Sequence, residues 1–247
     1  MSTTTTLLPA VLLALLASSE PLRAADFTFF ATLRAGRPGG GDWEMGLGST
    51  TVASDVTGSV LWSNGQPHWR DGDLPQNFEI GYRAATQSAY LTVWNSAGQQ
   101  QTIQFANTGT PLGPTATWTL PSANFFTSAS SAAQPSSINL ENLRFSAGVQ
   151  VLSGILPASL GASQPAPSAN NLAAPLVIDP SANGGTWAIA GTIRFSGLSG
   201  SDGTARGSAL QFMMGAAGAD TPEVSTSLSA GLGFAALGFA ALLRRIR

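Results

Sequence analysis

The sequence predicts an all-β fold, an antiparallel sandwich of two sheets. Three observations predict it. Only 10% of the 247 residues are charged, and the chain contains 28 glycines and 15 prolines. Short runs in which apolar residues alternate with polar or small ones recur along the middle of the chain, as expected for half-buried strands. Gly, Pro or Asn-Gly turns, such as Asn64-Gly65, separate these runs.

We predict about ten short strands, of which the segment from Thr186 to Ser196 is the clearest. There Trp187, Ile189, Ile193 and Phe195 share one face and Arg194 lies on the other. Two strands joined by a short connection are predicted at Phe78-Ile80-Tyr82 and from Tyr90 to Trp94, followed by a turn and a third strand at Ile103 to Phe105. The other alternating sets are Phe27-Phe29-Ala31-Leu33, Trp43-Met45-Leu47, Val60-Trp62, Ala116-Trp118-Leu120, Leu143-Phe145-Ala147-Val149-Val151 and Leu210-Phe212-Met214.

The number and spacing of these strands favour a jelly-roll or lectin-like sandwich over residues 25–215. One segment interrupts the pattern. Residues 156–180 are rich in Pro, Ser and Ala, and we expect them to form a long connection without regular structure.

The first 24 residues have the organisation of a secretory signal peptide. An apolar core from Leu7 to Ala17 is too short to span a bilayer comfortably, and a cleavage point follows at Ala24. The segment before the core contains no Lys or Arg, so only the α-amino group supplies the usual positive charge. An uncleaved N-terminal anchor is the alternative.

The C-terminal end has three parts in order. Residues 216–223 are predicted to form a linker that ends in a short motif with Pro222 and Glu223. Residues 224–243 are apolar over a length that crosses a bilayer of about 30 Å as a helix. Residues 244–247 are a basic stop containing Arg244, Arg245 and Arg247, the kind of sequence that remains on the cytoplasmic side.

This order of motif, apolar segment and arginines resembles the PEP-CTERM sorting signal of exported bacterial proteins. The resemblance implies that a membrane transpeptidase, an exosortase, recognises the chain at Pro222 and Glu223. Val224 stands where the family usually has a second proline. A plain membrane anchor is the alternative interpretation. The stretch from Gly72 to Tyr82 and the strand ending at Val93 and Trp94 also resemble the choice-of-anchor domains that precede such tails.

Composition excludes several classes of function. From Ala25 to Asp220 the chain has eleven acidic and seven basic residues, a formal charge of −4, so no basic surface is expected for nucleic acid. The chain has no cysteine, which removes disulfides, thiolate catalysis and thiolate metal sites. No Gly-x-Ser-x-Gly motif is present for a serine hydrolase. We predict no cofactor.

The densest polar cluster runs from Asn64 to Glu79 and contains the only histidine, His68. Four oxygen-bearing side chains in it are weak candidates for a Ca²⁺ site, although their spacing differs from that of an EF-hand loop: Asp71, Asp73, Asn77 and Glu79. A solvated turn entering the strand at Phe78 is the preferred interpretation. Trp69 and His68 are the candidate carbohydrate contacts, because Trp69 lies outside the alternating patterns in which most other tryptophans fall.

Two functions remain. The preferred one is a non-enzymatic β-sandwich that acts at the cell surface or in the extracellular matrix, in adhesion or association with exopolysaccharide. Signal peptidase and exosortase are expected to process this protein. Its tail is expected to hold it in the membrane temporarily. The alternative is a surface glycosidase, which needs two carboxyl groups at a defined separation. Its candidate carboxyl groups are Glu44, Asp71, Asp73, Glu79 and Glu141.

Overall fold

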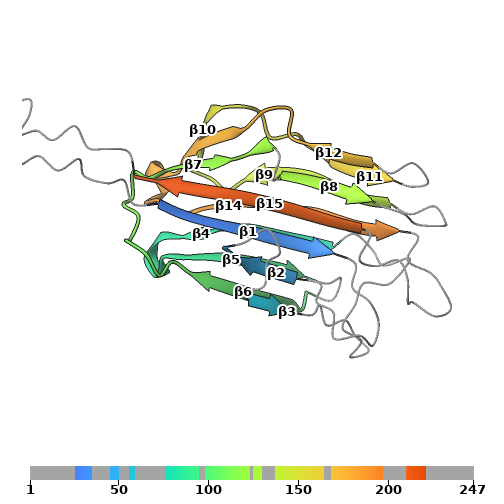
Figure 1. Cartoon of the computed structure of the whole chain (residues 1–247), viewed down its shortest axis with the longest axis horizontal. Coiled ribbons are helices and arrows are strands. Elements are labelled where there is room, and N and C mark those ends of the chain that lie inside the picture. Colours follow the sequence, from blue (N-terminus) through green and yellow to red (C-terminus); the bar gives the residue numbers. More distant parts are fainter. Residues whose placement is uncertain are drawn as a thin grey trace, which may run out of the picture. The chain divides into compact units, whose positions relative to one another are not determined.

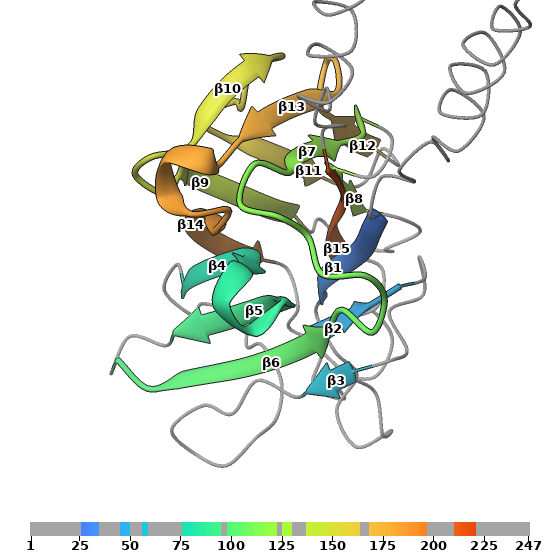
Figure 2. The same ribbon diagram turned by 90° about the vertical axis from the view of Figure 1, so that its left-hand side faces the viewer.

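A computed structural model of the chain describes residues 26–34, 45–49, 56–58, 76–94, 98–122, 125–129, 137–163, 168–196 and 210–220. In this part of the chain the structure is two antiparallel sheets packed face to face as a β-sandwich (Figures 1 and 2). The segment from Ala25 to Asp220 forms one compact unit. The all-β prediction and the prediction of a two-sheet sandwich are therefore confirmed.

The larger sheet has nine strands and the smaller sheet six. The nine strands include the path β10 (Gln150–Ser153), β13 (Leu176–Asp179), β7 (Thr117–Leu120), β15 (Leu210–Ala219), β1 (Asp26–Arg34), β2 (Met45–Gly48) and β3 (Val56–Gly58). Beside this path, β8 (Phe125–Ala129) pairs with β15 and with β12 (Ser168–Asn171). The six-stranded sheet has the order β11 (Leu160–Ser163), β9 (Ser137–Phe145), β14 (Trp187–Ser196), β4 (Gln76–Arg83), β5 (Ser88–Trp94) and β6 (Gln100–Ala106).

The first and last strands of the sandwich lie next to each other. β1 and β15 pair antiparallel over their whole shared length, from Asp26 opposite Ala219 to Arg34 opposite Gln211. Figure 1 shows the two strands side by side. On its other side β15 pairs with β7 and β8, so the last strand lies inside the sheet and not at its edge.

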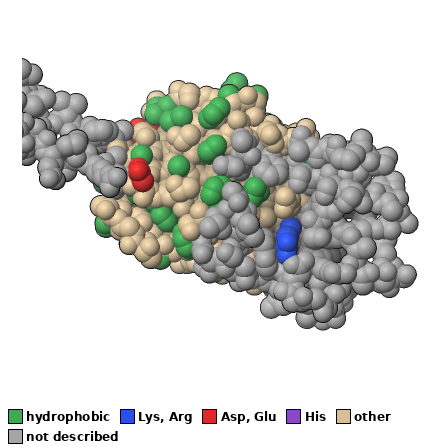
Figure 3. Space-filling view, viewed as in Figure 1, with side chains coloured by type: hydrophobic (Ala, Val, Ile, Leu, Met, Phe, Trp, Pro, Cys, Tyr) green, Lys and Arg blue, Asp and Glu red, His purple; other side chains and the backbone are tan. Residues whose placement is uncertain are grey.

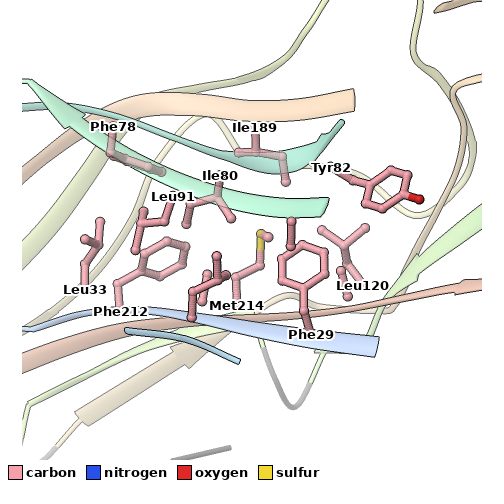
Figure 4. Close-up of a cluster of buried hydrophobic side chains, with 14 of the residues drawn as sticks. Phe29, Leu33, Phe78, Ile80, Tyr82, Leu91, Leu120, Ile189, Phe212 and Met214 are labelled. Atoms are coloured by element: carbon pink, nitrogen blue, oxygen red, sulfur yellow. The ribbon is translucent and has the colours of Figure 1, made fainter. Parts of the chain in front are cut away.

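Large and small side chains alternate across this pair on the face that packs against the second sheet. Ala216 lies opposite Phe29, and Ala31 opposite Met214. Figure 4 shows Phe29, Leu33, Phe212 and Met214 pointing toward Phe78, Ile80, Tyr82, Leu91 and Ile189 of the six-stranded sheet. All of these side chains are buried. Such interdigitation is how side chains reach the close packing of protein interiors.

An aromatic cluster centred on Trp118 of β7 joins the two sheets. Its ring centroid lies 4.7 Å from that of Tyr82 on β4 and 5.2 Å from that of Trp187 on β14. Phe27 and Phe29 of β1 pack against the same indole at 6.2 and 5.9 Å. Gly218 of β15 makes this packing fit, because a Cβ atom there would lie 2.8 Å from the indole ring.

Most of the predicted alternating patterns are confirmed. The apolar sets of β1, β4, β7 and β14 are buried as predicted, and Arg194 is exposed on the opposite face. The short connection between β4 and β5 contains the 3₁₀ turn η1 (Ala84–Thr86). Val60 and Trp62 lie outside the described residues.

Three predictions about the boundaries are wrong. Residues 156–180 are not one irregular connection, because they contain β11, β12 and β13. Pro175 directly precedes β13, so it marks the start of a strand where the composition suggested a loop. The set from Leu143 to Val151 is not one strand: β9 ends at Phe145 and β10 begins at Gln150, with Gly148 between them at a φ of 81°. Only a glycine adopts that conformation without strain.

The third wrong boundary is the end of the domain. The predicted linker over residues 216–223 begins too early, since Ala216 to Ala219 belong to β15 and pair with β1, and Ala217 to Ala219 pair with β7 as well. Ala216 and Gly218 lie opposite Phe29 and Phe27, and small residues in such positions leave no alternating apolar pattern in the sequence. In all, fifteen strands occur in the described part of the chain, against the ten predicted.

Two neighbouring methionines of β15 provide a matched test of the core. Met214 is fully buried, whereas Met213 points away from the core and is partly exposed. We expect Met214→Ala to lower the free energy of unfolding by about 2–5 kcal/mol, and Met213→Ala by less than about 1 kcal/mol. Urea unfolding followed by circular dichroism measures both. Equal losses in the two variants would contradict the assigned register of β15.

Candidate ligand-binding face

The outer face of the six-stranded sheet carries an ordered set of polar and aromatic side chains. Because side chains alternate along a strand, β4 sends Phe78, Ile80 and Tyr82 into the core and Asn77 and Glu79 outward. The outward positions of β4, β5 and β6 line up in rows across the strands, which the pairing register defines.

The first row contains a tyrosine held by charged neighbours. The phenol of Tyr90 on β5 donates a hydrogen bond to Glu79 Oε1 on β4. The guanidinium carbon of Arg83 lies 4.0 Å from the centre of the Tyr90 ring, a cation–π contact. Tyr90 is only 4% exposed. Burial, followed by the hydrogen bond to Glu79, raises the pKa of Tyr90, so its phenol stays protonated at alkaline pH values where a free tyrosine ionises.

The next rows lead toward the end of the sheet where β5 finishes. The hydroxyl groups of Thr92 on β5 and Thr102 on β6 are 2.8 Å apart and hydrogen-bonded. Beyond them, Trp94 lies between Asn77 on β4 and Gln100 on β6. Both amide residues are exposed, and Trp94 is partly exposed. An aromatic ring flanked by two amides can stack on the C–H face of a sugar ring while the amides bind its hydroxyl groups.

The Trp94 row lies at the end of the sandwich opposite Asp26, the first residue of β1, and Ala219, the last residue of β15. Asn77 follows the first residue of β4, and Gln76 pairs with Ile193 near the end of β14. At this end β1, β3, β5 and β14 finish and β2, β4, β6 and β15 begin (Figure 1). The β3–β4 connection contains His68 and Trp69 and returns to the sheet one residue before Asn77.

A second polar network closes the opposite end, near Asp26 and Ala219. Gln87 has a positive φ of 47°, and its side chain anchors the neighbouring loop. Gln87 Oε1 accepts hydrogen bonds from the Tyr82 phenol at 2.5 Å and from the Leu112 backbone N–H at 2.8 Å. The amide Nε2 of Gln87 donates to the Ala84 and Leu112 carbonyl oxygens at 3.0 and 3.1 Å.

Asp220 extends this network to the last described residue. Its Oδ1 accepts a hydrogen bond of 2.8 Å from the backbone N–H of Gly113, in the loop that Gln87 anchors. Burial and, secondarily, the charge of Asp220 raise the pKa of Tyr82 to about 12. The chain is thus held firmly up to Asp220, two residues before Pro222.

The structure describes only part of the predicted site. Asn77 and Glu79 lie on one face of β4, where Glu79 is bonded to Tyr90. Glu141 is exposed on β9. The other candidates lie outside the described residues: Glu44, His68, Trp69, Asp71, Asp73, Pro222, Glu223, Val224, Arg244, Arg245 and Arg247. Among the described residues, no group of three or more His, Asp or Glu side chains is placed to hold a metal ion.

The sequence prediction missed Tyr90 and Trp94 as residues of the outer face. The signal for them is present in the sequence: Tyr90, Thr92 and Trp94 alternate with Ala89, Leu91 and Val93, and only the second set fits a wholly apolar core face. The prediction placed a strand from Tyr90 to Trp94 without assigning which of its side chains face outward.

Comparisons give the chain no family. No protein-family model matches the sequence, and no curated protein matches it. Within the residues that the structure describes, there is no helix with the length and apolar character needed to cross a membrane.

The two tyrosines predict how stability depends on alkaline pH. Both have pKa values raised above the usual value of about 10, so the folded state keeps protons that the unfolded state loses. The free energy of unfolding should not respond to these groups below pH 10 and should fall as the pH rises from about 10 toward 12.

Tyrosinate absorbance tests this prediction directly, because the chain has two tyrosines and no lysine. We expect almost no tyrosinate in the folded protein at pH 10.5. In the unfolded chain, both tyrosines are largely ionised at this pH. The single variants Tyr82→Phe and Tyr90→Phe assign the two signals. Ionisation of either residue near pH 10 in the folded protein would contradict the burial described above.

Proposed function

We propose that this chain is an exported bacterial surface or matrix protein, sorted through its C-terminal tail, whose jelly-roll or lectin-like sandwich associates with polysaccharide without catalysing a reaction. One observation carries the proposal. Because Asp26 pairs with Ala219, the segments before β1 and after β15 are attached side by side at one end of the sandwich. The Trp94 row is at the other end, where a ligand is accessible when the first end is attached to a membrane.

The sequence of the two terminal segments supports the export part of the proposal. The signal peptide with its core at Leu7 to Ala17 directs the chain out of the cytoplasm, and the apolar segment from Val224 to Leu243 with its arginines halts it in the membrane. An exosortase then recognises Pro222 and Glu223. Two extended residues span at most about 7 Å, so the motif is attached almost directly to the anchored residue Asp220.

The outer face supports a binding function over a hydrolytic one. Glu79 and Glu141 lie on strands separated by β14, and their partners on β14, Ala190 and Thr192, are two residues apart. Standard strand spacings place their Cα atoms about 12 Å apart. A glycosidase needs two carboxyl groups about 5–9.5 Å apart that are free to act on the substrate, whereas Glu79 is hydrogen-bonded to the Tyr90 phenol and Glu141 lies two strands away on β9. Trp94 with Asn77 and Gln100 instead offers contacts for a bound sugar.

The mass of the mature protein tests the sorting signal. In cells that contain an exosortase, we expect a protein that begins after Ala24 and ends near Pro222 and Glu223, because both terminal segments are removed. The variant Glu223→Ala should retain the tail and accumulate in the membrane fraction, whereas Glu141→Ala, an exposed residue of β9, should be processed normally. A secreted wild-type protein that is intact through Arg247 would refute the sorting proposal.

Glycan binding tests the role of the sandwich. A glycan array followed by calorimetry on the exported protein should identify a polysaccharide that binds without release of reducing ends. Trp94→Ala should weaken binding by about tenfold or more, equivalent to about 1.4 kcal/mol, while Trp94→Tyr, which keeps an aromatic ring, should weaken it less. Release of reducing ends would favour the glycosidase, and equal binding by wild type and Trp94→Ala would exclude this face.

A further inference from the structure

The edge strand β10 exposes apolar side chains that the interior does not use. β10 is the terminal strand of the nine-stranded sheet, where its partner in the described part of the chain is β13. All four of its residues are exposed. Among the described side chains, the exposed large hydrophobic ones are Val151, Leu152 and Ile155, at 39%, 50% and 83%.

A shift of register explains why two successive residues of a strand both face solvent. The pairing of β10 with β13 shifts between Val151 and Ser153, which leaves Leu152 without a partner on β13. Such a bulge redirects side chains at the edge of a sheet. Figure 3 shows hydrophobic side chains gathered at the side of the sandwich where Figure 1 places β10.

β10 itself carries no charge, and the nearest charged residue on its partner strand is Asp179, opposite Gln150 at the end of β13. The sequence contains no Asp, Glu, Arg, Lys or His from Ser146 to Ile178, a stretch that includes β10, β11 and β12. Edge strands usually carry a charged residue, commonly lysine, or a proline that prevents pairing with another strand. β10 contains none of these residues.

The absence of charge favours a second copy of the same chain as the partner. The sequence from Ala25 to Asp220 carries a formal charge of −4, so two copies repel each other except where an uncharged side faces an uncharged side. In a dimer with a two-fold axis, each surface faces its own copy. A charged edge strand would therefore meet like charges, and the contact would be destabilised. An antiparallel β10 pair avoids this cost.

We propose that β10 is a self-association edge, at which two copies pair their β10 strands antiparallel around a two-fold axis. The nine-stranded sheet then continues from one copy into the other. Backbone hydrogen bonds across the axis add to the burial of Val151, Leu152 and Ile155, whose small apolar surface alone is less than a stable interface requires. The contact leaves the Trp94 row free, because that row belongs to the other sheet.

Cross-linking tests this edge cleanly, because the natural chain has no cysteine. A single Leu152→Cys substitution in the full chain provides one thiol per copy beside the two-fold axis, and a short bismaleimide joins two copies only when their thiols are close. Gln104→Cys is the matched control, since Gln104 is exposed on β6, an edge strand of the other sheet. Both variants carry the same C-terminal tail, so contacts between tails affect them equally.

We expect a covalent dimer from Leu152→Cys and little or none from Gln104→Cys. Adding Val151→Lys and Ser153→Lys to Leu152→Cys should remove the dimer, because it brings four positive charges together at the axis. Circular dichroism melting should show that these exposed substitutions leave the fold intact. The proposal is overturned if Leu152→Cys gives no more dimer than Gln104→Cys, or if the two lysines leave the dimer unchanged while the fold is retained.

Discussion

The pairing of β1 with β15 is the interaction on which the rest of this structure depends. It joins the first and last strands of the sandwich, and it places β15 between β1 on one side and β7 and β8 on the other. Without β15, the nine-stranded sheet separates into three parts, and the aromatic cluster around Trp118 loses the surface of Gly218 against which it packs. The sandwich is therefore incomplete until the chain is present through Ala219.

This arrangement links the order of the sequence to the proposed export. The strand that completes the fold is followed, after Asp220, by the residues of the proposed sorting motif. In an exported chain, β15 crosses the membrane last, so the domain completes its fold only when the tail arrives. The loop network of Gln87, Leu112 and Asp220 strengthens the attached end. The Trp94 row at the other end carries the proposed ligand contacts, so the proposed attachment and the proposed recognition occupy separate ends.

The sequence predicted the features that follow from the alternation of apolar and polar residues along one strand. It did not predict those that depend on which strands pair and in which register. The apolar faces of β1, β4 and β14 follow directly from their period of two. Ala216 to Ala219 were predicted as linker because small residues show no such pattern until their large partners, such as Phe29, are known. Trp94 was not recognised because facing inward or outward depends on the register with β4 and β6. The predicted sites at His68 to Asp73 and at Pro222 lie outside the described residues.

The closing role of β15 is tested most directly by two truncated chains without the N-terminal 24 residues, one ending at Asp220 and one ending before β15 at Ala209. Near-ultraviolet circular dichroism during heating reports the packing of Trp118, Trp187 and Tyr82. We predict that the chain ending at Asp220 shows a strong aromatic signal and one cooperative transition, because it contains every strand of the sandwich. The chain ending at Ala209 should show neither, and a cooperative transition in it would contradict the account.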